Sequence, residues 1–217
     1  MSALAVLVGQ YDSPFVRRVA VALNCYGIAF ERRVFSTFAD FEAMLALGPL
    51  GKVPVFVLPD GECLWDSRAI LDFLHGRASP ERLLLPRTEP ERHRIMRAEA
   101  TAVGLAEKAY ERGIELRRAS GTQDPRWIQR LERQIASALA WLEAQRPTPY
   151  LCGEVLSIAD VTAAIAITYI QNKWPELMAG TGFSAVVAHA AALEATPAFR
   201  AAPYSAVEAA GGAQPSR

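Results

Sequence analysis

The sequence contains few of the residues that build metal sites and disulfide frameworks. Of its 217 residues, three are cysteines and three are histidines. Cys25, Cys63 and Cys152 lie far apart, with no C-x-x-C pair and no histidine at metal-ligand spacing. We therefore expect buried thiols in a reducing, cytoplasmic compartment, with no metal and no disulfide framework.

An excess of charge of either sign and a long apolar run are also missing. Lys plus Arg and Asp plus Glu each total 23, so nucleic acid is a poor candidate partner. The longest apolar stretch, residues 158–170, includes Asp160 and is shorter than the roughly 20 residues that span a bilayer. The N-terminal residues 1–11 lack the basic region of a signal peptide. We expect a soluble protein without a membrane partner.

The first third of the chain alternates between strand-like and helical patterns. Residues 3–8 are continuously apolar, as in a strand that is covered on both faces. The predicted order is β-α-β-α-β-β-α, with these further elements: a helix after Pro14 that stops at Gly27, a strand over 30–34, a helix over 38–47, strands over 53–58 and 62–65, and a helix over 67–75.

The rest of the chain is helical in pattern. The polar residues 78–88 read as a linker between a domain over 1–77 and an all-helical domain over 89–205, and residues 206–217 as a flexible tail. Thr88 and Glu91 fit a capping box, and Asp124-Pro125 fits an N-cap followed by the first helical residue.

A second capping box is predicted at the start of the most apolar segment. Ser157 and Asp160 stand at the N-cap and N3 positions of a helix that is apolar nearly all the way round. Such a helix belongs at the centre of the second domain. We interpret this motif as a helix start and not as a catalytic group.

Four short motifs follow one another along the chain: S-P-F-V-R-R-V at 13–19, G-K-V-P at 51–54, D-S-R-A-I at 66–70 and S-I-A-D at 157–160. In this order they resemble the cytosolic glutathione S-transferases of the bacterial, serine type, over about residues 3–205. The resemblance implies a thioredoxin-like N-terminal domain followed by an all-helical C-terminal domain. It also implies glutathione as co-substrate, a small hydrophobic electrophile, a homodimer and a role in detoxification.

The resemblance also implies which residues hold glutathione. In the family the proline at position 54 is cis, and Val53 would pair its backbone with the cysteinyl part of glutathione, as a strand edge does. Lys52 would meet the glycyl carboxylate. The pair Asp66-Ser67 reads as an ordinary helix cap, but a helix N-terminus also suits the γ-glutamyl carboxylate, with Asp66 meeting the ammonium.

Two hydroxyls compete for the task of activating the glutathione thiol. In the serine-type family members the catalytic hydroxyl occupies the position of Ser13, which also reads as the N-cap before Pro14. Other classes use a tyrosine at the end of the first strand, and here Tyr11 stands beyond that end, in the loop. We predict Ser13 as the catalytic residue, with Tyr11 as the rival and the absence of any catalytic hydroxyl as the third alternative.

The electrophile pocket and the reaction type stay open. Tyr11, Val103, Tyr110 and Trp174 are candidates for the pocket, although each also fits a core position. The same fold hosts glutathione-dependent isomerases, peroxidases and lyases, and non-catalytic interaction proteins such as the stringent starvation proteins. Ser13, Asp66 and Ser67 together favour the transferase over a scaffold, and a serine in place of cysteine at position 13 excludes a mixed disulfide there.

Overall fold

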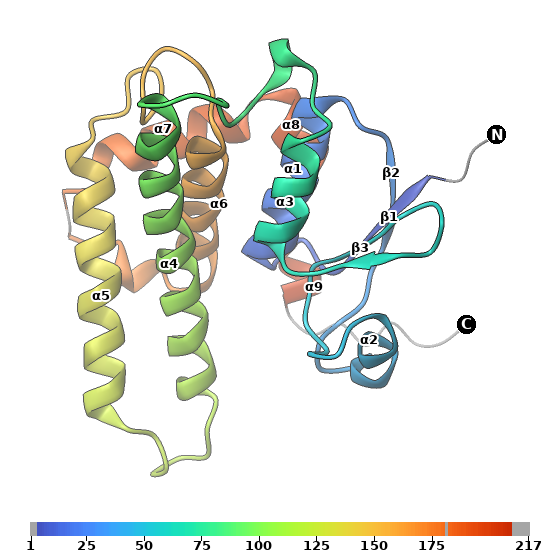
Figure 1. Cartoon of the computed structure of the whole chain (residues 1–217). Helices are drawn as coiled ribbons and strands as arrows, with labels where there is room; N and C mark the ends of the chain where they lie inside the picture. Colours follow the sequence, from blue (N-terminus) through green and yellow to red (C-terminus); the bar gives the residue numbers. More distant parts are fainter. Residues whose placement is uncertain (1–3, 181, 210–217) are drawn as a thin grey trace. The chain divides into compact units, whose positions relative to one another are not determined.

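The computed structural model describes residues 4–180 and 182–209 and divides the chain into two compact units (Figure 1). The first unit comprises the residues up to Leu84 together with those from Ala195 onward, and the second is Leu85–Glu194. The sequence placed the division at 77/78 and kept residues up to 205 in the helical domain. The difference arises because the segment after Glu194 hydrogen-bonds to the first unit: the Arg17 Nε donates to the Ala202 carbonyl at 2.7 Å.

The first unit is a mixed sheet with helices on both faces (Figure 1). Its strands lie in the order β2-β1-β3-β4, with β1 parallel to β2 and antiparallel to β3, and β4 antiparallel to β3. The elements are β1 (Ala5–Val8), α1 (Pro14–Tyr26), β2 (Phe30–Arg33), α2 (Phe41–Leu47), β3 (Val55–Val57), β4 (Cys63–Leu64), α3 (Ser67–His75) and the 3₁₀ turn η1 (Pro80–Arg82). This is the predicted order of elements.

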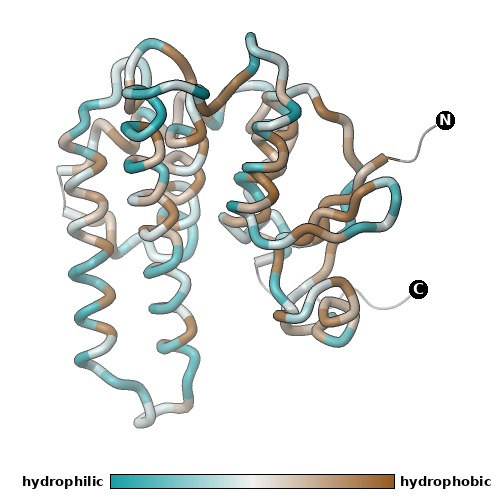
Figure 2. Tube along the Cα trace, in the orientation of Figure 1, coloured by the Kyte–Doolittle hydropathy of each residue, from teal (hydrophilic) through white to brown (hydrophobic). Residues whose placement is uncertain are grey.

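The two faces of the sheet follow from the alternation of side chains along each strand. Val8 and Val55 pack against Met44 of α2 on one face. Leu7 and Phe56, next to them in the strands, point to the opposite face and are also buried. Helices α1 and α3, which contact each other, cover that second face. Figure 2 shows the apolar character of β1 and β3 that this burial on both faces requires.

The second unit consists of helices. They are α4 (Glu91–Leu116), α5 (Pro125–Ala144), α6 (Ile158–Lys173), the 3₁₀ turn η2 (Pro175–Leu177) and α7 (Ser184–Glu194). Helix α6 is buried along most of its length and packs against α4 and α7, as its apolar sequence predicts. The Asp160 side chain accepts a hydrogen bond from the Ser157 N–H at 2.9 Å, which confirms the capping box. The fold class, a thioredoxin-like domain followed by an all-helical domain, is confirmed.

Three local predictions need correction. Helix α4 begins after Pro90 and not after Thr88, and its first turn is instead capped by Glu89, whose carboxylate accepts the His93 N–H at 3.1 Å. The three cysteines are free thiols, but they are partly exposed and not buried as expected: Cys25 lies near the end of α1, Cys63 begins β4, and Cys152 lies in a turn between α5 and α6. Residues 206–209, expected in a flexible tail, form a short helix.

The chain after Glu194 adds two short helices to the first unit: α8 (Pro197–Arg200) and α9 (Ala206–Ala209). The remaining residues of the predicted tail, 210–217, lie outside the described residues. Helix α8 packs on α1, where the Asn24 side-chain amide donates to the Ala198 carbonyl at 2.9 Å. Within the described residues, no helix is both long and apolar enough to cross a bilayer.

Candidate functional site

The loop between β1 and α1 carries Ser13. Its side chain caps α1, because its oxygen accepts a hydrogen bond from the Val16 N–H at 3.4 Å and Pro14 opens the helix. The Ser13 backbone N–H donates to the Gln10 carbonyl at 3.2 Å. Accepting the bond from Val16 uses a lone pair of the hydroxyl and not its proton. The capping geometry therefore leaves the Ser13 hydroxyl able to donate to a ligand.

The strand register brings Val53 to the same edge of the sheet as this loop. Val8, the last residue of β1, pairs with Val55, the first residue of β3. The Val53-Pro54 peptide bond just before β3 is cis. Gly9 has a φ of 136°, and a Cβ there would lie 2.5 Å from the Val16 Cγ2 and 3.0 Å from the Val53 Cβ. Only glycine allows the loop to approach Val53 and α1 this closely.

The N-terminus of α3 provides the third part of this edge. The Asp66 Oδ1 accepts hydrogen bonds from the Arg68 N–H at 2.9 Å and the Ala69 N–H at 3.4 Å, so Asp66 is the N-cap. Ser67, the first helical residue, is buried, whereas Asp66 is exposed. Lys52, one residue before Val53, is also exposed. The positive dipole ends of α1 and α3 both favour bound negative charge.

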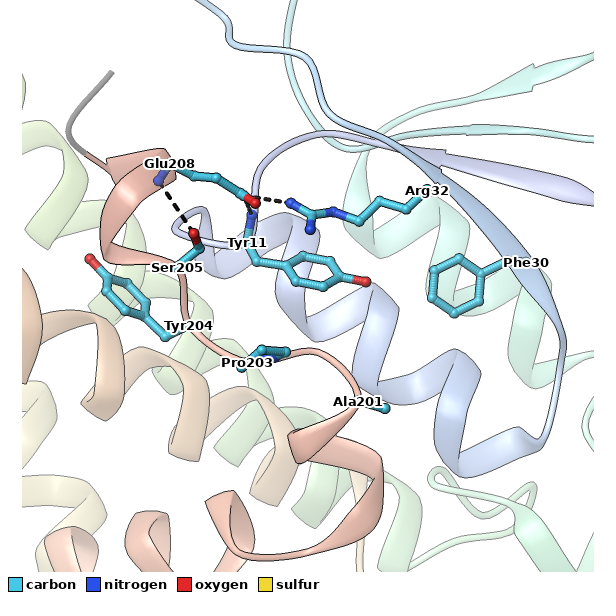
Figure 3. Close-up of a pocket in the computed structure, with 8 residues that line it drawn as sticks. All are labelled: Tyr11, Phe30, Arg32, Ala201, Pro203, Tyr204, Ser205 and Glu208. Atoms are coloured by element: carbon cyan, nitrogen blue, oxygen red, sulfur yellow. Dashed lines mark hydrogen bonds and ion pairs between the residues drawn. The ribbon is translucent and has the colours of Figure 1, made fainter. Parts of the chain in front are cut away.

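Tyr11 lies in the β1–α1 loop with its ring buried. Burial raises the pKa of Tyr11, and the nearby Arg32 guanidinium opposes that shift, so the side chain remains a neutral phenol at physiological pH. The guanidinium carbon of Arg32 lies 3.5 Å from the centroid of the Tyr11 ring. Tyr11, Phe30, Arg32 and Tyr204 line a cavity of about 500 Å³ in the first unit (Figure 3).

The other three candidates for the electrophile pocket belong to the second unit. Val103 is buried in α4, 2% exposed, and contributes to the core of that unit. Tyr110, further along the same helix, is 42% exposed. Trp174 follows α6 and packs on α4, since a Cβ at Gly113 would lie 2.7 Å from its ring and the Arg112 guanidinium lies 5.0 Å from the ring centroid. Of the three, Tyr110 is the side chain most accessible to a ligand.

Two residues near the predicted site, Arg32 and Glu208, were not predicted from the sequence. The Glu208 carboxylate accepts a hydrogen bond from the Tyr11 N–H at 2.6 Å and forms an ion pair with Arg32 at 2.5 Å. Neither contact has a local sequence signal, because Glu208 is 176 residues from Arg32 along the chain. The part of the chain that the structure describes holds no group of three or more His, Cys, Asp or Glu side chains suited to a metal ion.

Comparison with known proteins matches both halves of the chain to one family. Residues 7–82 match the family model of the glutathione S-transferase N-terminal domain, and residues 125–201 match that of the C-terminal domain. The chain belongs to the glutathione S-transferase family. This family member is also similar to the uncharacterized GST-like protein YibF of Escherichia coli K12, with 30% identity over 168 residues, 77% of this chain and 82% of YibF.

Solved glutathione S-transferases share the fold of this family member over most of its length. A glutathione S-transferase from Methylobacillus flagellatus KT, with glutathione bound, superimposes with a TM-score of 0.86 at 27% identity, covering 93% of this chain and 100% of the other. A family member from Pseudomonas fluorescens Pf-5, also with bound glutathione, gives a TM-score of 0.81 at 28% identity, covering 93% and 99%.

Proposed function

We propose that this protein is an active glutathione transferase in which the Ser13 hydroxyl stabilises the glutathione thiolate for attack on an apolar electrophile. The observation that carries the proposal is the position of Ser13 as N-cap of α1 in a loop that packs directly against Val53. A thiol with a pKa of about 8.5 is only a few per cent ionised at pH 7, so a shift of about two units makes the thiolate dominant. Each unit corresponds to about 1.4 kcal/mol.

Glutathione would lie along the edge formed by Val53 and the N-terminus of α3. Its cysteinyl backbone pairs with Val53, its γ-glutamyl carboxylate meets Ser67 at the helix N-terminus, and its ammonium meets Asp66. Lys52 meets the glycyl carboxylate. The glutathione bound in the Methylobacillus flagellatus and Pseudomonas fluorescens proteins supports this assignment, because both share the fold of this chain over nearly its full length.

The electrophile is a small apolar molecule. Of the four predicted contacts, Tyr11 lines a cavity of the first unit and Tyr110 is exposed on the second, whereas Val103 and Trp174 serve the packing of the second unit. Aromatic side chains suit such a ligand, since they offer a large apolar area at low conformational cost. Catalysis then combines thiolate stabilisation with the proximity of the two substrates. We assign the protein to detoxification in the cytoplasm, where its three free cysteines would stay reduced.

We also propose that the protein works as a homodimer. Large apolar side chains in and beside α2 are exposed, among them Phe38, Phe41 and Leu50. A group of exposed apolar residues on one short segment is typical of a surface that another chain covers. The molar mass in solution, measured by light scattering, tests this directly: twice the chain mass of 23.7 kDa supports the dimer.

The function is tested by binding and by conjugation. The protein should be retained on immobilised glutathione and released by free glutathione, and it should conjugate glutathione to a chloronitrobenzene probe. A parallel assay with an organic hydroperoxide separates a peroxidase from a transferase. Binding without turnover of either probe would contradict the transferase, and failure to bind glutathione would favour the non-catalytic interaction protein.

A further inference from the structure

The C-terminal helix α9 holds the loop that carries Ser13. The Glu208 Oε2 accepts a hydrogen bond from the backbone N–H of Tyr11 at 2.6 Å, and the same oxygen pairs with the Arg32 Nη2 at 2.5 Å (Figure 3). Tyr11 precedes Ser13 by two residues. One carboxylate therefore connects strand β2, the loop and the C-terminal segment of the first unit.

The backbone of Glu208 strengthens this connection. Its carbonyl accepts a hydrogen bond from the Gln10 side-chain amide at 3.2 Å, and its N–H donates to the Ser205 Oγ at 3.3 Å. Two consecutive loop residues, Gln10 and Tyr11, are thus bound to a single residue of α9. The loop has a further fixed point, because the Gly9 N–H donates to the Arg33 carbonyl at 2.9 Å.

The ion pair that orients the carboxylate is mostly buried. The side chains of Arg32 and Glu208 are 24% and 19% exposed, so salt screens their attraction less than that of a surface pair. The Arg32 guanidinium also lies over the Tyr11 ring, which fixes Arg32 from a second side. A charge-assisted bond from a backbone N–H to a carboxylate held in this way is stronger than a neutral one.

Movement of Tyr11 is transmitted to Ser13 through the backbone. The Ser13 N–H donates to the Gln10 carbonyl, so the turn from Gln10 to Ser13 moves as a unit. Loss of the bond from Tyr11 to Glu208 would remove a charged anchor from this turn. An error of about 1 Å in the position of a catalytic group costs on the order of 100-fold in rate.

We propose that Glu208 is a positioning residue that holds the Gly9–Ser13 loop so that the Ser13 hydroxyl reaches the glutathione sulfur. Glu208 acts through Tyr11 and Gln10, and it touches neither Ser13 nor the thiol. The inference rests on the proposed function, because it concerns the thiol activation that we assign to Ser13. It adds a requirement for the C-terminal segment to a glutathione site whose other proposed residues all lie in the N-terminal third of the chain.

The test compares Glu208→Gln and Glu208→Ala with the wild type by turnover, by the KM for glutathione and by the apparent thiol pKa of bound glutathione. The glutamine variant keeps an acceptor for the Tyr11 N–H but loses the charge that pairs with Arg32, whereas the alanine variant loses both. We expect kcat to fall about 10-fold in the first variant and up to about 100-fold in the second. The pKa of the bound glutathione thiol should return toward that of free glutathione, by less in Glu208→Gln than in Glu208→Ala.

Controls separate positioning from general damage. Val207→Ala changes the neighbouring residue of α9, which is 78% exposed, and should leave kcat and the thiol pKa unchanged. Arg32→Met should reproduce the effect of Glu208→Gln. The variant that combines these two changes should lose no more activity than the more damaging of them alone, because both break the same pair. A fold-loss of kcat in the double variant equal to the product of the two single fold-losses would show that the changes act independently and would overturn the proposal.

The outcomes distinguish this inference from the function on which it rests. If the wild type lowers the thiol pKa and Ser13→Ala abolishes the shift, while Glu208→Ala folds and keeps wild-type kcat and thiol pKa, the positioning role is wrong and the function stands. A lower melting temperature with unchanged kinetics also overturns it, since Glu208 would then only stabilise the fold. If the wild type leaves the thiol pKa unchanged, both proposals fail.

Discussion

The Ser13 hydroxyl oxygen accepts a hydrogen bond from the Val16 N–H at 3.4 Å and thereby caps helix α1, at the edge of the sheet where we propose that glutathione binds. Capping requires an acceptor, whereas thiolate stabilisation requires a donor. A single hydroxyl supplies both, but the two roles respond differently to substitution. This difference allows the structural role of Ser13 to be measured apart from the proposed catalytic one.

Substitution of Ser13 should separate these roles. Ser13→Ala loses the cap and should lower the free energy of unfolding by about 0.5–2 kcal/mol. Ser13→Asp restores the acceptor and hence the stability, but an ionised carboxylate has no proton to give to sulfur. Both variants should lose conjugation activity, while urea unfolding separates them. Wild-type turnover in either variant would exclude Ser13 as the activating group.

Replacement of Asp66 by asparagine should weaken glutathione binding without unfolding α3. Asparagine caps a helix as well as aspartate does, so the bonds from Arg68 and Ala69 are kept. The negative charge for the ammonium of glutathione is lost. We expect the KM for glutathione to rise about tenfold, which corresponds to about 1.4 kcal/mol, with the melting temperature unchanged. An unchanged KM would show that Asp66 serves only as the cap.

The buried carboxylate of Asp160 should be essential for the stability of the second unit. It accepts the Leu151 N–H at 2.7 Å and the Ser157 N–H at 2.9 Å, and it lies 3.2 Å from the His189 Nε2. Asp160→Ala leaves the Leu151 and Ser157 N–H groups buried without their acceptor and should cost about 3–5 kcal/mol. Ser157→Ala keeps the backbone bond and should cost only about 1 kcal/mol. Chemical unfolding of both variants measures the difference, and equal costs would contradict the account.

Cys25 should make the protein less stable in alkali. Burial raises the pKa of Cys25 to about 11, whereas an unfolded cysteine titrates near a pKa of about 8.5. Between these values the unfolded chain releases the thiol proton and the folded chain keeps it, so the free energy of unfolding falls as the pH rises. The stability difference between wild type and Cys25→Ala should therefore shrink between about pH 8.5 and about pH 11. A difference that is independent of pH would contradict this.

Local sequence signals predicted those parts of the fold that neighbouring residues determine. Ser13-Pro14, Asp124-Pro125 and the Ser157–Asp160 box each combine a cap with the residue that begins the helix, and the structure has a helix start at each. The start of α4 was missed because Glu89, and not Thr88, caps its first turn. Glutamate is not among the residues preferred at a helix N-cap, so the sequence pattern pointed to Thr88 and gave no signal for the contact of Glu89.

The contacts of the C-terminal segment could not be predicted in this way. Glu208 stands in a stretch rich in alanine and glycine without helical periodicity, and its partner Tyr11 is 197 residues away. A hydrogen bond between such distant residues depends on the path of the chain through α8, which no pattern around residue 208 records. The sequence therefore led to a prediction for the glutathione site, but it gave no sign of the contact between Glu208 and the loop before α1.

The central claim is that Ser13 lowers the pKa of the glutathione thiol. It is tested most directly by titrating the thiolate absorbance of bound glutathione against pH with the wild type and with Ser13→Ala. The account predicts that the wild type lowers the apparent thiol pKa by at least about one unit and that the variant does not. An equal shift in both proteins would contradict it and would assign the activation to Tyr11 or to the dipole of α1.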